Sequence, residues 1–115
     1  MKLVFICSPY RQARGKNERR ARALCRWAAL QDLLPLAPHV YFTRFLDDAL
    51  EDERERGLRC ALELVRLADE VWVFPPASRE LSPGMTREIA LARELGKPIR
   101  EFEPGFSPPN IEAGG

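Results

Sequence analysis

The chain has 115 residues, of which 45% are hydrophobic and 30% charged, and its net charge is +1. This balance is typical of one globular domain and disfavours a disordered chain, while the small net charge disfavours a general nucleic-acid-binding protein. The apolar runs fall short of the roughly 18 residues that span a bilayer, and the apolar start is too short for a signal peptide. We therefore expect a cytoplasmic protein that contacts neither nucleic acid nor membrane.

The three cysteines, Cys7, Cys25 and Cys60, lie within apolar patterns and form no CxxC pair. They are expected to be reduced core thiols. The chain has a single histidine and contains no Walker A, G-x-G-x-x-G or G-x-S-x-G motif. We expect neither a metal site nor a cofactor.

The first half of the chain predicts two strands separated by a helix. Residues 2–7 form a nearly continuous apolar run, typical of a parallel strand that is covered on both faces. Residues 12–16 are expected to form a mobile loop, and Asn17 to cap a helix whose apolar side chains recur at helical spacing. Residues 34–40 predict a second strand that runs into a loop, and their prolines place it at an edge or a strand end.

The second half predicts two helices and two strands. The chain is expected to be helical from residue 47 onward. Residues 70–74, rich in β-branched and aromatic side chains, form the clearest strand, and a loop follows it. A helix is predicted over residues 83–95, since Gly96 is a typical helix-ending residue, and residues 99–102 are expected to form the last strand.

The alternation of strands and helices predicts an α/β fold, a Rossmann- or flavodoxin-like three-layer sandwich with a parallel sheet of four to five strands. We expect residues 1–102 to form the domain. Residues 103–115 are rich in proline and glycine and are expected to form a tail that packs little or serves as a contact arm.

Ligands of parallel sheets bind beyond the carboxyl ends of the strands, which here points to the loops over residues 8–16, 37–44 and 75–84. In the first loop, Ser8 and Arg11 carry a hydroxyl and a guanidinium suited to a phosphate or a ribose. We expect these groups to converge with polar groups of the other two loops.

The other two loops hold further candidates. Ser82, Pro83 and Gly84 precede the last helix, and the free backbone N–H groups up to Met85 form a candidate anion site; the same tripeptide is also an ordinary turn and cap. His39, the only histidine, either caps backbone groups at a strand end or takes part in binding.

Glu88 is the most informative position. On a helical wheel it falls within the apolar arc of Met85, Ile89 and Ala92 instead of opposite it. A carboxylate on a buried face is costly unless it is paired or faces a cavity, and the nearby helix N-terminus favours its charged form. Glu88 is therefore either a functional carboxylate or a structural one that a nearby arginine or tyrosine satisfies.

Charged residues are unevenly distributed along the chain. Residues 11–26 hold seven basic residues and one acidic residue, whereas residues 47–56 hold six acidic and two basic ones. The two runs are consistent with solvated helix faces, with an anion-binding mouth, or with patches that meet between subunits.

Together these residues resemble the nucleoside 2-deoxyribosyltransferase-like superfamily, over roughly residues 2–102. Residues 5–11, FICSPYR, are similar to the family's first strand and its sugar- or phosphate-binding loop. The most specific piece is residues 82–88, SPGMTRE, which match the S-x-G-x-x-x-E helix start that carries the family's nucleophilic glutamate. In length and in its sequence motifs, the chain is most similar to short bacterial and phage members of the superfamily without an assigned function.

The resemblance implies an enzyme that cleaves or transfers the N-glycosidic bond of a deoxynucleoside or its monophosphate. Glu88 would attack the anomeric carbon and form a covalent deoxyribosyl intermediate, and Tyr10 would orient it. The 5′-hydroxyl or phosphate would be held by Ser8, Arg11, Ser82 and Gly84. The family's second catalytic carboxylate has no direct match, and Glu63 is the nearest candidate, with Asp69 the other.

Three hypotheses follow from these observations. A second carboxylate, Glu63 or Asp69, within about 6 Å of Glu88 would favour the enzyme. The alternative is a non-catalytic nucleotide-binding module of the same fold. An interaction protein that uses its two charged patches would have no closed pocket. The resemblance also implies a homodimer or larger assembly, for which Phe42 and Phe45 are expected to offer exposed surface.

Overall fold

The computed structural model describes residues 1–11 and 13–109. Four strands form one sheet in the order β2-β1-β3-β4, and every neighbouring pair is parallel. The strands are β1 (Leu3–Cys7), β2 (Leu34–Leu36), β3 (Glu70–Val73) and β4 (Ile99–Glu101). The helical segments are α1 (Arg14–Ala29), α2 (Pro38–Tyr41), the 3₁₀ turn η1 (Phe42–Arg44), α3 (Glu51–Leu67) and α4 (Pro83–Glu94). The predicted α/β fold with a four-stranded parallel sheet is confirmed.

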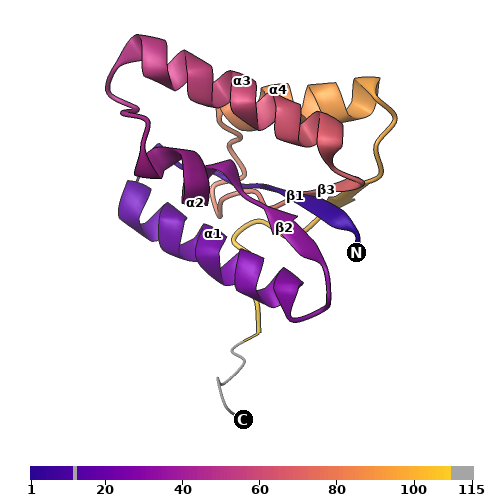
Figure 1. Ribbon diagram of the computed structural model, residues 1–115. Coiled ribbons are helices and arrows are strands. Elements are labelled where there is room, and N and C mark those ends of the chain that lie inside the picture. Colours follow the sequence, from indigo (N-terminus) through magenta and orange to yellow (C-terminus); the bar gives the residue numbers. More distant parts are fainter. Residues whose placement is uncertain (12, 110–115) are drawn as a thin grey trace.

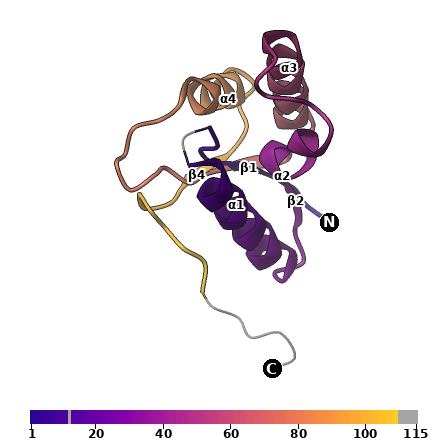
Figure 2. The ribbon, with the colours of Figure 1, turned by 90° about the vertical axis from the view of Figure 1, so that its left-hand side faces the viewer.

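The sheet lies between two helical layers, with α1 on one face and α3 and α4 on the other (Figures 1 and 2). Because side chains alternate along a strand, β1 contributes to both cores. Val4 and Ile6 pack against Leu24 of α1, while Phe5 and Cys7 face the side of α3 and α4. The nearly continuous apolar sequence of β1 is explained by this burial on both faces.

Helix α1 begins four residues earlier than its sequence suggested. Arg14 is its first residue, and its N-cap is Ala13, in the left-handed region at φ 57°. Asn17 lies inside the first turn and donates a hydrogen bond from its side chain to the backbone oxygen of Tyr10, 3.0 Å away. The predictions of a capping Asn17 and of a loop through residue 16 are wrong, and Gln12 lies outside the described residues.

Strand β2 is shorter than predicted because Pro38 occupies the first turn of a helix, α2, instead of continuing the strand. The start of α3 is later than predicted, at Glu51, and its first turn is acidic, as the helix dipole favours. Helix α4 matches its prediction to within one residue: Ser82 caps it, and Gly96 follows it at φ 69°.

The segment after β4 packs against the core. The ring of Phe106 lies 4.9 Å from that of Phe102, 5.3 Å from that of Trp27 and 5.9 Å from that of Phe74, between ring centres. The expectation that the tail packs little is therefore wrong at Phe106, since its aromatic ring extends the core beneath α1. Residues 110–115 lie outside the described residues. Among the helices that the structure describes, none has the length and hydropathy to span a membrane.

Candidate active site

A cleft of about 1080 Å³ opens at the carboxyl ends of the strands. Residues of all three loops expected from the sequence line it, together with the first turns of α1 and α4 and part of α3. A cleft of this volume is large enough to hold a small-molecule ligand.

Glu88 lies at this cleft, in the second turn of α4, and is only 4% exposed. The Ser82 cap fixes the start of the helix, and the apolar neighbours Met85, Ile89 and Ala92 pack the same face into the core. Burial therefore follows from the position that the helical wheel gave to Glu88. The carboxyl group is held on a rigid element at the wall of the cleft.

The Glu88 carboxyl has no cationic partner within the described part of the chain, where its one polar contact is the Cys7 thiol. Burial raises the pKa of Glu88 to about 8, and the hydrogen bond from Cys7 acts in the opposite direction. Neither an arginine nor a tyrosine of the described chain satisfies the carboxyl group. The described residues therefore do not supply the partner that the structural interpretation of Glu88 requires.

Cys7 ends β1 and Ser8 follows it, and neither residue is among those that line the cleft. The Cys7 sulfur lies 3.9 Å from the backbone oxygen of Met85, and burial, followed by the charge of Glu88, raises the pKa of the thiol well above its ordinary value. The Ser8 hydroxyl is buried and, among the described residues, is the one buried side-chain oxygen or nitrogen without a hydrogen-bond partner. Such a group is stabilised when a water or a ligand supplies the partner.

Tyr10 and His39 form a stacked pair at the cleft, with ring centres 4.7 Å apart and an interplanar angle of 14°. His39 Nε2 lies 3.0 Å from the Ser8 backbone oxygen. Because a carbonyl only accepts hydrogen bonds, Nε2 carries the proton. Burial lowers the pKa of His39, so its ring is neutral near pH 7, although Ser8 and Asp48 oppose this shift. No hydrogen bond joins Tyr10 to Glu88 in the described chain, and the predicted orienting contact is not made.

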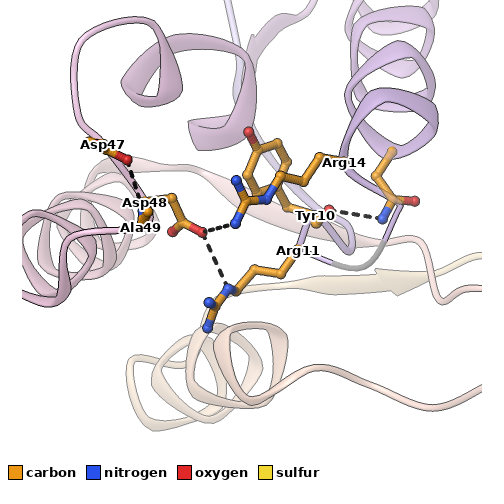
Figure 3. Close-up of polar contacts among 7 residues, drawn as sticks. Tyr10, Arg11, Arg14, Asp47, Asp48 and Ala49 are labelled. Atoms are coloured by element: carbon orange, nitrogen blue, oxygen red, sulfur yellow. Dashed lines mark hydrogen bonds and ion pairs between the residues drawn. The ribbon is translucent and has the colours of Figure 1, made fainter.

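Arg11 and Arg14 meet one carboxylate at the cleft (Figure 3). Arg11 Nε and Arg14 Nη2 lie 3.2 and 3.3 Å from the same oxygen of Asp48, which precedes α3 and is 20% exposed. The basic run over residues 11–26 and the acidic run over residues 47–56 thus contact each other within one chain, through these ion pairs to Asp48. Asp48 was not predicted as a site residue, because one aspartate in an acidic run carries no signal of its own.

The start of α4 is capped within the chain. The Ser82 hydroxyl accepts a hydrogen bond from the Met85 backbone N–H at 3.2 Å, and the Met85 side chain is buried in the core. This leaves the Gly84 N–H as the backbone donor of the predicted anion site, since Pro83 has none. Ser82 and Gly84 both line the cleft, as does the buried Met85.

The two candidates for a second carboxylate lie away from the cleft. Glu63 is on the outer face of α3, with its side chain 70% exposed and paired with Arg66 at 3.4 Å. Asp69 precedes β3 and therefore lies at the amino end of the sheet, where it accepts a hydrogen bond from the Leu3 backbone N–H at 2.7 Å. The structure does not bring either residue to Glu88. In the described residues, no group of three His, Cys, Asp or Glu side chains is arranged to hold a metal ion.

Residues 2–102 match the protein family described as Domain of unknown function (DUF7768). The chain belongs to this family. No curated protein matches this DUF7768 chain.

Solved structures share the fold of this DUF7768 domain at low sequence identity. One is a 2-deoxyribosyltransferase from the psychrotolerant bacterium Bacillus psychrosaccharolyticus, with 15% identity, a TM-score of 0.73 and coverage of 96% of this chain and 77% of that chain. Another is a 2-desoxiribosyltransferase from Leishmania mexicana, with 20% identity, a TM-score of 0.61 and coverage of 89% of this chain and 64% of that chain. The fold is nucleoside 2-deoxyribosyltransferase-like, as the sequence resemblance implied.

Proposed function

We propose that this chain cleaves or transfers the N-glycosidic bond of a deoxynucleoside or deoxynucleoside monophosphate, with Glu88 as the nucleophile. The observation that carries the proposal is the buried Glu88 carboxyl group at the cleft, unpaired with any cation of the described chain. A structural carboxylate would be expected to have such a partner. The two similar structures are both deoxyribosyltransferases, which supports the same kind of bond as the target.

In the proposed reaction, an ionised oxygen of Glu88 attacks the anomeric carbon of the sugar. The bond from that carbon to the base nitrogen breaks, the nitrogen keeps the electron pair, and the base takes up a proton from water in the cleft. Water then opens the resulting glycosyl ester, which gives free sugar, or the nitrogen of a second base does so, which gives a new nucleoside. Glu63 and Asp69 have no part in this sequence, because both lie away from the cleft.

The raised pKa of Glu88 has a direct kinetic consequence. With a pKa of about 8, most Glu88 side chains are protonated at pH 7, and only the ionised fraction is nucleophilic. The rate of base release should therefore rise with pH and level off above about pH 8. A rate that falls through the same pH would instead identify the Glu88 carboxylic acid as a proton donor to the leaving base.

The groups around Glu88 suit a nucleoside. The stacked Tyr10–His39 pair lines the cleft and offers an aromatic face and edge to a planar base. The Gly84 N–H and the guanidinium groups of Arg11 and Arg14 suit the 5′-hydroxyl or phosphate. A nucleoside or nucleotide is thus the ligand that matches these donors and rings best.

The test is incubation of the protein with deoxynucleosides and their 5′-monophosphates, followed by chromatography for free base. The chain should release base from at least one of them, and mass spectrometry of the quenched reaction should find the sugar on the peptide that contains Glu88. Glu88→Gln should abolish both signals, whereas the matched change Glu63→Gln, on an exposed side chain, should alter neither. Base release that survives Glu88→Gln would contradict the proposal.

The non-catalytic nucleotide-binding module is the second candidate. It is favoured by the position of Glu63 and Asp69 outside the cleft and by the protonated state of Glu88 near pH 7. Calorimetry that detects binding of a nucleotide, together with the absence of base release between pH 6 and about pH 9, would establish it.

We also propose that the chain forms a homodimer or larger assembly. Tyr41 and Phe45, at the end of α2 and beyond η1, are 63% and 58% exposed and lie in one aromatic cluster with the partly buried Phe42. Exposed aromatic clusters of this kind are common at subunit interfaces. Light scattering at micromolar concentration should give a mass well above 13.1 kDa, and the monomer mass would contradict the proposal.

A further inference from the structure

Arg20 is a partly buried cation whose role the proposed chemistry does not explain. It lies in α1, lines the cleft, and donates hydrogen bonds of 3.1–3.3 Å to three backbone oxygens. Two of these oxygens, those of Phe74 and Pro75, follow β3, and the third, that of Phe106, follows β4. Burial lowers the pKa of Arg20, and no carboxylate of the described chain pairs with it. Arg20 therefore joins two segments that are about thirty residues apart in the sequence.

The segment after β4 makes two further backbone hydrogen bonds, one to the loop after β3 and one within the segment. The Gly105 N–H donates to the Pro75 oxygen at 2.9 Å, and the Phe106 N–H donates to the Glu103 oxygen at 3.0 Å. Gly105 has a φ of 74°, and a Cβ at this position would lie 3.3 Å from the Ala77 side chain. A glycine is thus required both by the backbone conformation and by the close approach to the loop after β3.

This segment forms part of the cleft. Gly105 and Ser107 line it together with Pro76 and Ala77, at the β4 side of the sheet. Tyr10 and His39 lie toward the other side, because they follow β1 and β2. A ligand that extends along the carboxyl edge, past Glu88, therefore meets the aromatic pair at one end and this segment at the other. The match to the DUF7768 family ends at residue 102, so this part of the cleft lies beyond the matched domain.

We propose that residues 105–107 form the β4-side wall of the substrate site, with Ser107 as a specificity-determining residue and Arg20 as the positioning residue that holds the wall. The identity of the ligand rests on the proposed function. The wall itself rests on the contacts of Arg20, Gly105 and Phe106. Arg20 also holds the loop after β3 that leads to Ser82, and it thereby links the wall to the start of α4.

The first experiment measures how tightly deoxynucleosides and their 5′-monophosphates bind, by calorimetry, in a pair of tryptophan variants. Ser107→Trp places an indole in the cleft and should weaken binding of the best ligand about tenfold or more. The matched control Glu103→Trp adds the same side chain to the same segment, at an exposed residue that does not line the cleft, and should bind within about twofold of the wild type. Equal binding by Ser107→Trp and the wild type would overturn the proposal.

The second experiment tests the anchor with a readout that needs no ligand. In the wild type, the Gly105 amide should be protected from hydrogen exchange, and Arg20→Gln should lose most of this protection while Arg20→Lys keeps part of it. In base-release assays well below the melting temperature, Arg20→Gln should raise KM about three- to tenfold with kcat little changed. An unchanged KM with a lowered melting temperature would show that Arg20 is only structural.

The two experiments also separate this proposal from the proposed function. A wild type that binds none of the compounds would contradict the proposed function and the role of Ser107 as a specificity residue for these compounds. The exchange measurement would still decide the anchored wall, because it depends only on the folded chain. A Gly105 amide that exchanges freely in the wild type would overturn the wall whatever the ligand.

Discussion

At the amino end of the sheet, acidic side chains are satisfied by the fold. Asp69 accepts a hydrogen bond from the Leu3 backbone N–H at 2.7 Å, and Glu70 accepts one from the Trp72 indole at 2.7 Å and one from Lys2 at 3.3 Å. At the carboxyl end, by contrast, the buried Glu88 has the Cys7 thiol as its one polar contact in the described chain. The carboxyl groups at the two ends of the sheet therefore have different surroundings.

The two ends of the sheet differ in how their carboxyl groups affect folding stability. At the amino end, each hydrogen bond to a carboxylate stabilises the folded chain. At the carboxyl edge, ionisation of Glu88 costs folding free energy because its surroundings are apolar. An ionisable group that destabilises the folded state when it is charged is typical of a functional site, because activity at such sites often costs folding stability.

The largest expected effect is on catalysis. Glu88→Gln should lower base release by about three orders of magnitude or more, as expected when a covalent nucleophile is lost. Asp69→Asn, the same chemical change at the amino edge, should leave kcat near the wild-type value. The measurement is the steady-state rate of each variant, corrected for the amount of folded protein. An equal fall in both variants would contradict the distinction between the two ends of the sheet.

The next effect is on stability as a function of pH. Since the folded pKa of Glu88 is about 8 and its ordinary value 4.5, the unfolded chain loses this proton first, and the folded state is destabilised as pH rises between these values. The free energy of unfolding should fall by a few kcal/mol, on the order of 4, between about pH 5 and pH 9. Urea unfolding of Glu88→Gln should lack this fall and show higher stability than the wild type at pH 9.

Removal of a carboxylate that accepts hydrogen bonds should destabilise the folded state, the opposite of the effect of Glu88→Gln at high pH. Asp69→Ala deprives the Leu3 N–H of its acceptor and should lower the free energy of unfolding by about 1 kcal/mol, because the bond lies near the surface. Glu63→Ala, which removes an exposed side chain, should stay within about 0.5 kcal/mol of the wild type. A stabilised Asp69→Ala protein would contradict the structural role of the amino edge.

The smallest effect concerns Asp48, which shows that a carboxylate at the cleft can also have partners. Asp48→Asn frees Arg11 and Arg14 and should change stability by less than about 1 kcal/mol, since both arginine side chains are at least half exposed to solvent. The freed guanidinium groups should bind a nucleoside monophosphate a few times more tightly, and the gain should decrease with added salt. Calorimetry at low and high ionic strength measures this, and equal affinities in both proteins would exclude Asp48 as a competitor of the phosphate.

Most of the fold could be predicted from the sequence because the apolar patterns are strong. The β-branched run of β3 and the Ser82 and Gly96 boundaries of α4 each carry a local physical cause. The failures occurred where tertiary contacts override local preference. Asn17 has a capping side chain but bonds the Tyr10 backbone from within the helix, and Phe106 lies in a Pro/Gly-rich segment yet joins the aromatic core.

The candidate site was only partly predictable. The wheel position of Glu88 was sufficient to predict its burial, because helical spacing determines the face. The position of Asp69 directly before β3 was also sufficient to place it at the amino edge, away from a site at the carboxyl ends. The pairing of Asp48 with Arg11 and Arg14, and the anchoring by Arg20, depend on contacts between distant segments that no local pattern indicates.

The most direct test of the account is the titration of the Glu88 carboxyl carbon by NMR, with the resonance assigned by its absence in Glu88→Gln. The folded wild type should show a midpoint near pH 8, since the carboxyl group is buried at the cleft without a cation. A midpoint near its ordinary value of 4.5 would show that Glu88 is solvated or paired in solution, and would contradict the distinction between the two edges of the sheet.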